Sequence, residues 1–292
     1  MDPVAGHEVG LIGDFFSSDG TISDLRLQKI YVKGANNSQV GGIAAVGRGI
    51  VFNDSVEGTI STGKNTSGGG SGAIVGGLVG LINSGGIENS FSKGKVKGGE
   101  NAIVGGMAGE VSVDGIYTGS VSVSYSTASV SLDSGTCNRC SIGNAQNSAG
   151  GLVGVNNGLV TESYATGSVT GGSSANLGGL VGLNIKVTAE SGINVSYSTG
   201  AVTGGSGSSI GGAIGYDQAS GDLADVYWNT TSSGVANSNQ GAGNIPNDSG
   251  ITGLTTTQLQ SGLPGGFSSE TWGENANING GLPYLLGVPT KK

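Results

Sequence analysis

The stretch GGLVGVNNGLVTESYATGSV, residues 150–169, contains the two sequence units that decide the fold. It begins with the five-residue unit Gly150-Gly151-Leu152-Val153-Gly154 and ends with the seven-residue unit Ser163-Tyr164-Ala165-Thr166-Gly167-Ser168-Val169. Between them, Asn156-Asn157-Gly158 predicts a turn that precedes the apolar pair Leu159-Val160. The stretch therefore contains about three short β-prone runs separated by turn residues.

Both units recur along the chain. The five-residue unit starts at Gly76, Gly105, Gly150, Gly178 and Gly211, with degenerate copies starting at Val9 and Gly41. Successive starts are separated by 32, 35, 29, 45, 28 and 33 residues, so the period is near 30 and one copy is enlarged. The other copies of the seven-residue unit occupy residues 90–96, 124–130 and 196–202. Repetition at this period is typical of a solenoid.

Stacking explains how such short runs become stable. Each run pairs with its equivalent in the next repeat at about 4.8 Å, and the small apolar side chains then form a continuous core. Glycine fits the tight corners, and a narrow interior fits an aromatic content of only 5%. Low-complexity disorder is disfavoured because two motifs keep their register in each period. We predict an all-β fold, a parallel β-helix or β-solenoid of about seven coils with a divergent C-terminal cap.

The glycine-bracketed units resemble the GLUG motif family, which occurs in large bacterial surface and secreted proteins. Filamentous haemagglutinin-like adhesins and the repeat regions of some secreted immunoglobulin-cleaving peptidases are examples. The resemblance covers most of the chain, from residues 10–13, 21–25 and 32–34 at the start to residues 226–229, 253–259 and 282–285 near the end. It implies a bacterial protein that is secreted or held at the cell surface and that acts in cell adhesion.

The composition changes near residue 226, because four of the five prolines and both tryptophans lie beyond it. We therefore assign residues 1–226 to the GLUG-repeat β-solenoid and residues 227–292 to a C-terminal cap or divergent final coils. Residues 254–259 are expected to form a short helical turn with a threonine N-cap. The chain starts almost inside its first repeat, so we expect it to belong to a longer exported chain or to stack end to end.

The composition argues against several classes of function. Twelve Lys and Arg against 20 Asp and Glu give a net charge of −8, which argues against nucleic-acid binding. No apolar run approaches the length of a transmembrane helix. The only histidine is His7, so a catalytic triad would depend on a terminal residue and a multi-histidine metal site is impossible. We predict no catalytic residues, no metal and no cofactor.

One aromatic residue holds the same place in successive copies of the seven-residue unit. These residues are Phe91, Tyr125, Tyr164 and Tyr197, and Tyr227 extends the series. A column facing outward offers planes on which sugar rings stack, whereas a structural ladder fixes register by ring contact. We favour the structural interpretation and leave the direction of the column open.

Lys93, Lys95 and Lys97 alternate with Gly94 and Val96, which places three ammonium groups on one strand face. They form either a binding site for an anionic glycan or, the interpretation that we favour, a solvated strand face with Val96 turned inward. The aromatic column and these lysines are the candidate ligand-binding residues.

Cys137 and Cys140 lie within the enlarged repeat. A zinc site would need two more ligands, and none of the required type is near. A disulfide that closes an inserted loop in an oxidising compartment is favoured over two free thiols.

Three functions fit this sequence. The first is a non-catalytic adhesin whose loops attach to host or neighbouring cells or to their glycans, and the second is a passive stalk or spacer. The third is a polysaccharide-degrading β-helix enzyme, which would need carboxylates from neighbouring coils within about 5–10 Å. Acidic residues rarely recur at equivalent positions, and turn and cap roles account for Asp217, Asp222 and Asp225. We favour the adhesin, with the enlarged repeat projecting a loop.

Overall fold

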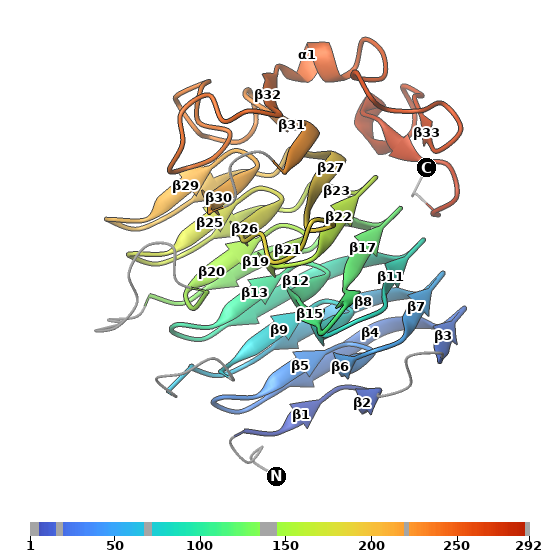
Figure 1. The fold of residues 1–292 in the computed structure, drawn as a ribbon, viewed down its shortest axis with the longest axis vertical. Coiled ribbons are helices and arrows are strands. Elements are labelled where there is room, and N and C mark those ends of the chain that lie inside the picture. Colours follow the sequence, from blue (N-terminus) through green and yellow to red (C-terminus); the bar gives the residue numbers. More distant parts are fainter. Residues whose placement is uncertain (1–5, 16–19, 67–71, 135–144, 219–221, 290–292) are drawn as a thin grey trace.

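The chain is a parallel β-solenoid, as the repeats predict (Figure 1). This computed structural model describes all residues except 1–5, 16–19, 67–71, 135–144, 219–221 and 290–292. Each coil contributes one strand to each of two seven-stranded sheets, A and B, and further strands to a 16-stranded sheet C. Equivalent strands of successive coils pair in parallel, so each coil lies directly on the one before it.

Sheet A contains the strand that ends at the first residue of each five-residue unit, which is glycine in all copies but the first. Its strands are β1 (Glu8–Val9), β5 (Gln39–Gly41), β9 (Ile74–Gly76), β13 (Ile103–Gly105), β20 (Ser148–Gly150), β25 (Asn176–Gly178) and β29 (Ser209–Gly211). Sheet B begins three residues later in full copies of the unit. Its strands are β2 (Ile12–Phe15), β6 (Ala44–Gly47), β10 (Val79–Ile82), β14 (Ala108–Val111), β21 (Val153–Asn156), β26 (Val181–Asn184) and β30 (Ile214–Asp217).

Sheet C contains the second half of each repeat, including the seven-residue unit. Its strands up to residue 98 are β3 (Thr21–Ser23), β4 (Arg26–Lys33), β7 (Ile50–Phe52), β8 (Ser55–Ser61), β11 (Gly86–Glu88) and β12 (Phe91–Gly98). Its later strands are β17 (Ser120–Ser122), β18 (Tyr125–Ser126), β19 (Ser129–Leu132), β22 (Leu159–Thr161), β23 (Tyr164–Ala165), β24 (Val169–Thr170), β27 (Gly192–Ser198), β28 (Val202–Thr203), β31 (Leu223–Asn229) and β32 (Ile251–Leu254).

The corner between sheets A and B requires glycine because it packs closely against sheet C and against the next coil. A Cβ atom on Gly106 would lie 2.0 Å from the carbonyl oxygen of Gly151 and 2.4 Å from Oγ of Ser126. Neither distance is physically acceptable for a carbon atom. The third residue of the unit turns inward instead and starts the core.

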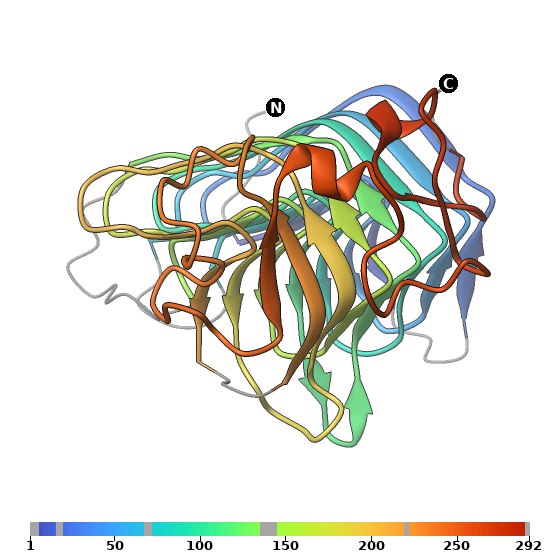
Figure 2. The ribbon, with the colours of Figure 1, turned by 90° about the horizontal axis from the view of Figure 1, so that it is seen from above.

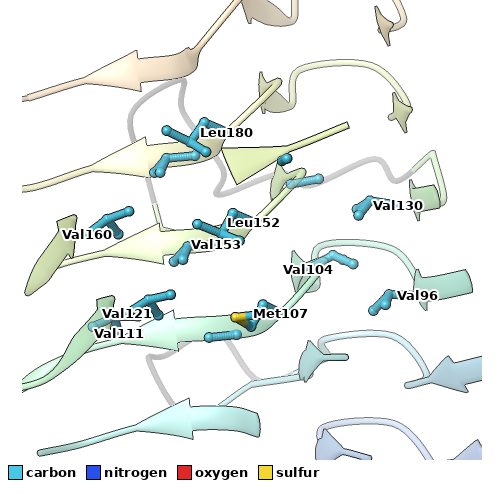
Figure 3. Close-up of a cluster of buried hydrophobic side chains, with 14 of the residues drawn as sticks. Val96, Val104, Met107, Val111, Val121, Val130, Leu152, Val153, Val160 and Leu180 are labelled. Atoms are coloured by element: carbon cyan, nitrogen blue, oxygen red, sulfur yellow. The ribbon is translucent and has the colours of Figure 1, made fainter. Parts of the chain in front are cut away.

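Small apolar side chains from the three sheets fill the interior, one layer for each coil (Figure 3). One ladder is formed by Leu78, Met107, Leu152 and Leu180, and another by Val96, Val130, Val169 and Val202. All of these residues are buried. Stacking like on like therefore produces the continuous core that the repeats predict.

A buried serine shapes the bend inside sheet C. Ser163 donates a hydrogen bond from its hydroxyl to the carbonyl of Thr161 (2.7 Å) and accepts one from the backbone N–H of Ser124 in the preceding coil (3.3 Å). Ser90, Ser124 and Ser196 occupy the same position in their coils. This serine ladder satisfies backbone groups that the bend would otherwise leave unpaired.

The first coil has an irregular outer edge. Strand β4 pairs with β8, and among the described residues it pairs with no other strand. A bulge between Gln28 and Ile30 leaves Lys29 with a φ of 55°. Leu11, at the corner of this coil, is 60% exposed.

The other end of the solenoid is covered. Sheet C continues across residue 226 through β31 and β32, and α1 (Thr256–Leu259) follows with Thr255 as its N-cap, as predicted. The chain then turns back along the outside of the coils, where β33 (Trp272–Gly273) and β34 (Tyr284–Leu285) form a small hairpin (Figures 1 and 2). In the described part of the chain, no helix is long and apolar enough to cross a membrane.

Candidate functional site

The predicted aromatic column exists, and it lies on the outer face of sheet C. The centroids of neighbouring rings from Phe91 to Tyr197 are 5.2, 4.8 and 5.1 Å apart, and the ring planes are within 11° of parallel. Tyr227 continues the register above Tyr197. The residue after each ring points inward, since Ser92 and Ser198 donate hydrogen bonds to carbonyls of the glycine corner. The rings therefore project away from the core.

The C-terminal tail, residues 263–289, covers most of this column. Trp272 packs against Tyr164 and Tyr197 at centroid distances of 6.0 and 5.9 Å, and Phe267 packs against Trp272 at 4.4 Å. Tyr164 and Tyr197 are 1% and 0% exposed as a result. The tail thus occupies the face that sequence reasoning considered for a ligand, and the geometry favours the structural interpretation for these tyrosines.

Backbone carbonyls of the tail receive the phenol groups. The hydroxyl of Tyr125 donates to the carbonyl of Pro289 (2.5 Å), and that of Tyr197 donates to the carbonyl of Pro283 (2.6 Å). Asn279 donates to the Tyr197 oxygen through its side-chain amide (2.8 Å). Burial raises the pKa of the Tyr197 phenol above its ordinary range, so it remains a neutral hydrogen-bond donor.

The three candidate lysines point outward from β12 with Val96 turned into the core. Lys93 Nζ lies 3.0 Å from Glu57 Oε1, and Lys97 Nζ lies 3.0 Å from Asp133 Oδ1. Lys95 is exposed. Because carboxylates compensate two of the three charges, this face is a poor site for an anionic glycan.

A pocket remains at the open end of the column. It has a volume of about 250 Å³ and lies between the edge of the aromatic column and a polar column two residues further along each strand. Its apolar wall contains Phe91 and Tyr125, and its polar wall contains Glu57 and Lys93. Pro289 closes one side.

Two loops project together from the side of the solenoid (Figure 2). The first is the hairpin of β15 (Val113–Asp114) and β16 (Tyr117–Thr118), which lies in the enlarged repeat, and the second is the loop of residues 185–191. The hydroxyl oxygens of Thr118 and Thr188 are 3.4 Å apart. We call these two segments the loop pair.

Apolar side chains are exposed on the loop pair. Ile116 is 86% exposed, Tyr117 is 63% exposed and Val187 is 55% exposed. Asp114, which lies next to the turn at the tip of the hairpin, forms an ion pair with Arg48, with 3.1 Å between Oδ2 and Nη1. The enlarged length of the repeat predicts a projecting loop, whereas no feature of the sequence predicts that a second loop lies beside it.

The acidic residues have separate partners. Asp217 packs against Asp248 beneath the cap, where they are 2% and 5% exposed, too buried to bind a polymer. Asp222 forms an ion pair with Lys186, and Asp225 lies beside Gly266. Within the residues that the structure describes, no three His, Cys, Asp or Glu side chains gather as metal ligands. Cys137 and Cys140, with their predicted disulfide, lie outside those residues.

Comparison with known proteins supports the fold. No family model and no curated protein matches the chain. A solved structure of an IgA1 protease matches 72% of the chain with a TM-score of 0.51 and 19% sequence identity. The matched region spans only 16% of that protein's chain. At this identity the similarity concerns the β-solenoid architecture.

Proposed function

We propose that this chain is a non-catalytic adhesive segment of an exported bacterial protein, secreted or held at the cell surface. In this proposal the β-solenoid is a stiff scaffold, and its loops attach to host or neighbouring cells or to their glycans. The GLUG-like repeats support it, because they resemble those of filamentous haemagglutinin-like adhesins.

The loop pair is the observation that carries the proposal. Ile116, Tyr117 and Val187 would be costly to expose if the rod were only a spacer. The described turns at the same corner of three other coils, between β6 and β7, β10 and β11, and β21 and β22, have no such extension. Binding residues are commonly found on loops that a rigid framework positions. Weak contacts from several such rods on one surface would add to a strong attachment.

Adherence of the purified chain to host epithelial and bacterial cells tests the proposal. We expect the amount of the variant Ile116→Ser/Tyr117→Ser/Val187→Ser that binds to cells to be at least tenfold lower than that of the parent chain. The matched control is Tyr31→Ser, which replaces an aromatic side chain that is 70% exposed in the first coil. Unchanged circular dichroism would show that both variants fold.

Two results would contradict the adhesive function. The parent chain could fail to adhere to any cell type, which would favour a passive spacer. Alternatively, the triple variant could adhere as well as the parent. Release of reducing sugar from a polysaccharide panel would instead favour the enzyme.

A further inference from the structure

The aromatic column ends before the solenoid does. In the coil below Phe91 the register position is held by Ser55, and in the first coil by Arg26. Among the described rings only Tyr125 stacks on Phe91. Because a serine side chain is too short to replace a ring, the face of Phe91 that points away from Tyr125 has no aromatic cover. Phe91 is only partly buried, and it lines the pocket described above.

The polar wall of this pocket offers both donors and acceptors. Gln28, Glu57, Lys93 and Thr127 hold equivalent positions in four successive coils, and their spacing is about 4.8 Å. Glu57 accepts hydrogen bonds, Lys93 donates them, and the amide of Gln28 does both. The Lys93–Glu57 ion pair leaves the wall with little net charge.

We propose that this pocket binds one neutral hexopyranose unit, packed against the free face of Phe91. A pyranose ring has an apolar face of C–H groups and an edge of hydroxyls, and each hydroxyl both donates and accepts. The pocket presents the matching surfaces side by side. Its volume of about 250 Å³ lies just below the roughly 300–1,000 Å³ of pockets for drug-sized ligands, which suits a single ring.

The position of the tail selects the end of a glycan over its middle. Pro289 and Asn279 line the pocket on the side of the tail, and the Pro289 carbonyl is held there by Tyr125. Because these two tail residues limit the exit on that side, we place the rest of a sugar chain on the side of the first coils, where Gln28 lies. The compensated charge favours neutral sugars over sialic acid. The inference rests on the proposed attachment function for its biological purpose, but its residues are separate from the loop pair.

Nuclear magnetic resonance on the full chain tests the site directly. The probes are the methyl glycosides of glucose, galactose, mannose and N-acetylglucosamine, with methyl sialoside as the anionic comparison. We expect saturable binding of at least one neutral probe and none of the sialoside. Phe91→Leu keeps an apolar side chain but removes the ring face, so it should weaken binding at least tenfold. Glu57→Gln should weaken binding at least threefold.

Lys97→Ala is the matched control, because Lys97 lies on the same strand and pairs with Asp133 outside the pocket. Its affinity should equal that of the parent. The site is wrong if no neutral probe saturates, or if Phe91→Leu binds as tightly as the parent while keeping its thermal midpoint. The loop-pair variant should retain sugar binding, because its residues lie outside the pocket. If the parent chain binds a sugar but adheres to no cell, or if the loop-pair variant adheres as well as the parent, the proposed function is overturned and this site still stands.

Discussion

At the scale of single residues, the bend in sheet C depends on one serine hydroxyl in each of four successive coils. The residue before a serine of the ladder has a positive φ, which is 51° for Asn89, 43° for Val123 and 46° for Val195. Asparagine adopts this conformation readily, whereas valine rarely does. The bend therefore keeps its shape even where the local residue opposes it, because the hydrogen bonds of the serine ladder hold it.

Replacing Ser163 tests this role. Ser163→Ala leaves the buried N–H of Ser124 and the carbonyl of Thr161 without their partner, which should lower the free energy of unfolding by about 1–3 kcal/mol. Urea unfolding measures the change. Ser173→Ala is the control, because among the described residues the Ser173 hydroxyl makes only an exposed 3.4 Å contact with Ser206. Equal losses in the two variants would contradict the role of the ladder.

A buried carboxyl pair makes stability depend on pH. Burial, followed by the charge of Asp217, raises the pKa of Asp248 from 3.8 to about 6. The folded state thus favours the protonated acid. The protonated acid therefore adds to the free energy of unfolding. This stabilisation is fully present below about pH 4 and is lost as the pH rises through about 6. Burial also raises the pKa of Asp54 to about 6, so it acts in the same direction.

Thermal unfolding across this range gives the check. The parent chain should be more stable at pH 4.5 than at pH 7.5. Asp248→Asn should gain about 1–3 kcal/mol over the parent at pH 7.5 and little at pH 4.5, since each unit of pKa shift corresponds to about 1.4 kcal/mol. A variant with the same pH profile as the parent would show that Asp248 does not contribute to it.

At the scale of elements, the corner glycines set how closely the sheets approach. Gly106→Ala places a Cβ atom 2.0 Å from a backbone carbonyl that cannot move without shifting the next coil. We expect a loss of roughly 3 kcal/mol or more, or no folded protein, by analogy with overpacked cores. Gly47→Ala meets only Val79 at 3.6 Å and should change stability little. Similar unfolding midpoints for both variants would contradict this account.

The tail is a second element whose packing can be tested on its own. Trp272→Ala should remove about 3–5 kcal/mol of packing from the column and release the tail, while the coils stay folded. Hydrogen exchange should then quicken in residues 263–289 and stay slow in β23 and β27. Trp272→Phe is the control, because the indole N–H has no partner among the described residues. Fast exchange throughout the coils would mean that the tail holds the solenoid together.

At the scale of the whole molecule, the features that repeat along the chain could be predicted from the sequence, and the features that occur once could not. The Gly-Gly corner, the inward valines and the ring at Tyr164 recur at fixed positions, so stacking follows from their spacing. The serines of the ladder also recur in the sequence, because Ser90, Ser124, Ser163 and Ser196 each precede one ring of the column. Their role in the bend follows only from the hydrogen bonds that the structure shows.

The return of the tail onto the column could not be predicted. The hydrogen bond between Tyr125 and Pro289 joins residues 164 positions apart, and the tail has no repeat to indicate its partner. The aromatic residues of the tail, Phe267, Trp272 and Tyr284, indicate that it packs against something but do not identify the partner. The second member of the loop pair was missed for a similar reason, since the period that contains residues 185–191 has an ordinary length.

The bulge in β4 has a consequence for how these molecules behave in concentrated solution. A flat, unpaired edge strand invites another molecule to continue the sheet, and a bulge with a cationic residue discourages it. Deletion of Lys29 would straighten the strand, and we expect light scattering to rise with protein concentration as filaments assemble. Lys29→Ala keeps the bulge and should remain dispersed. One irregular residue would then separate a chain that stays dispersed from one that polymerises.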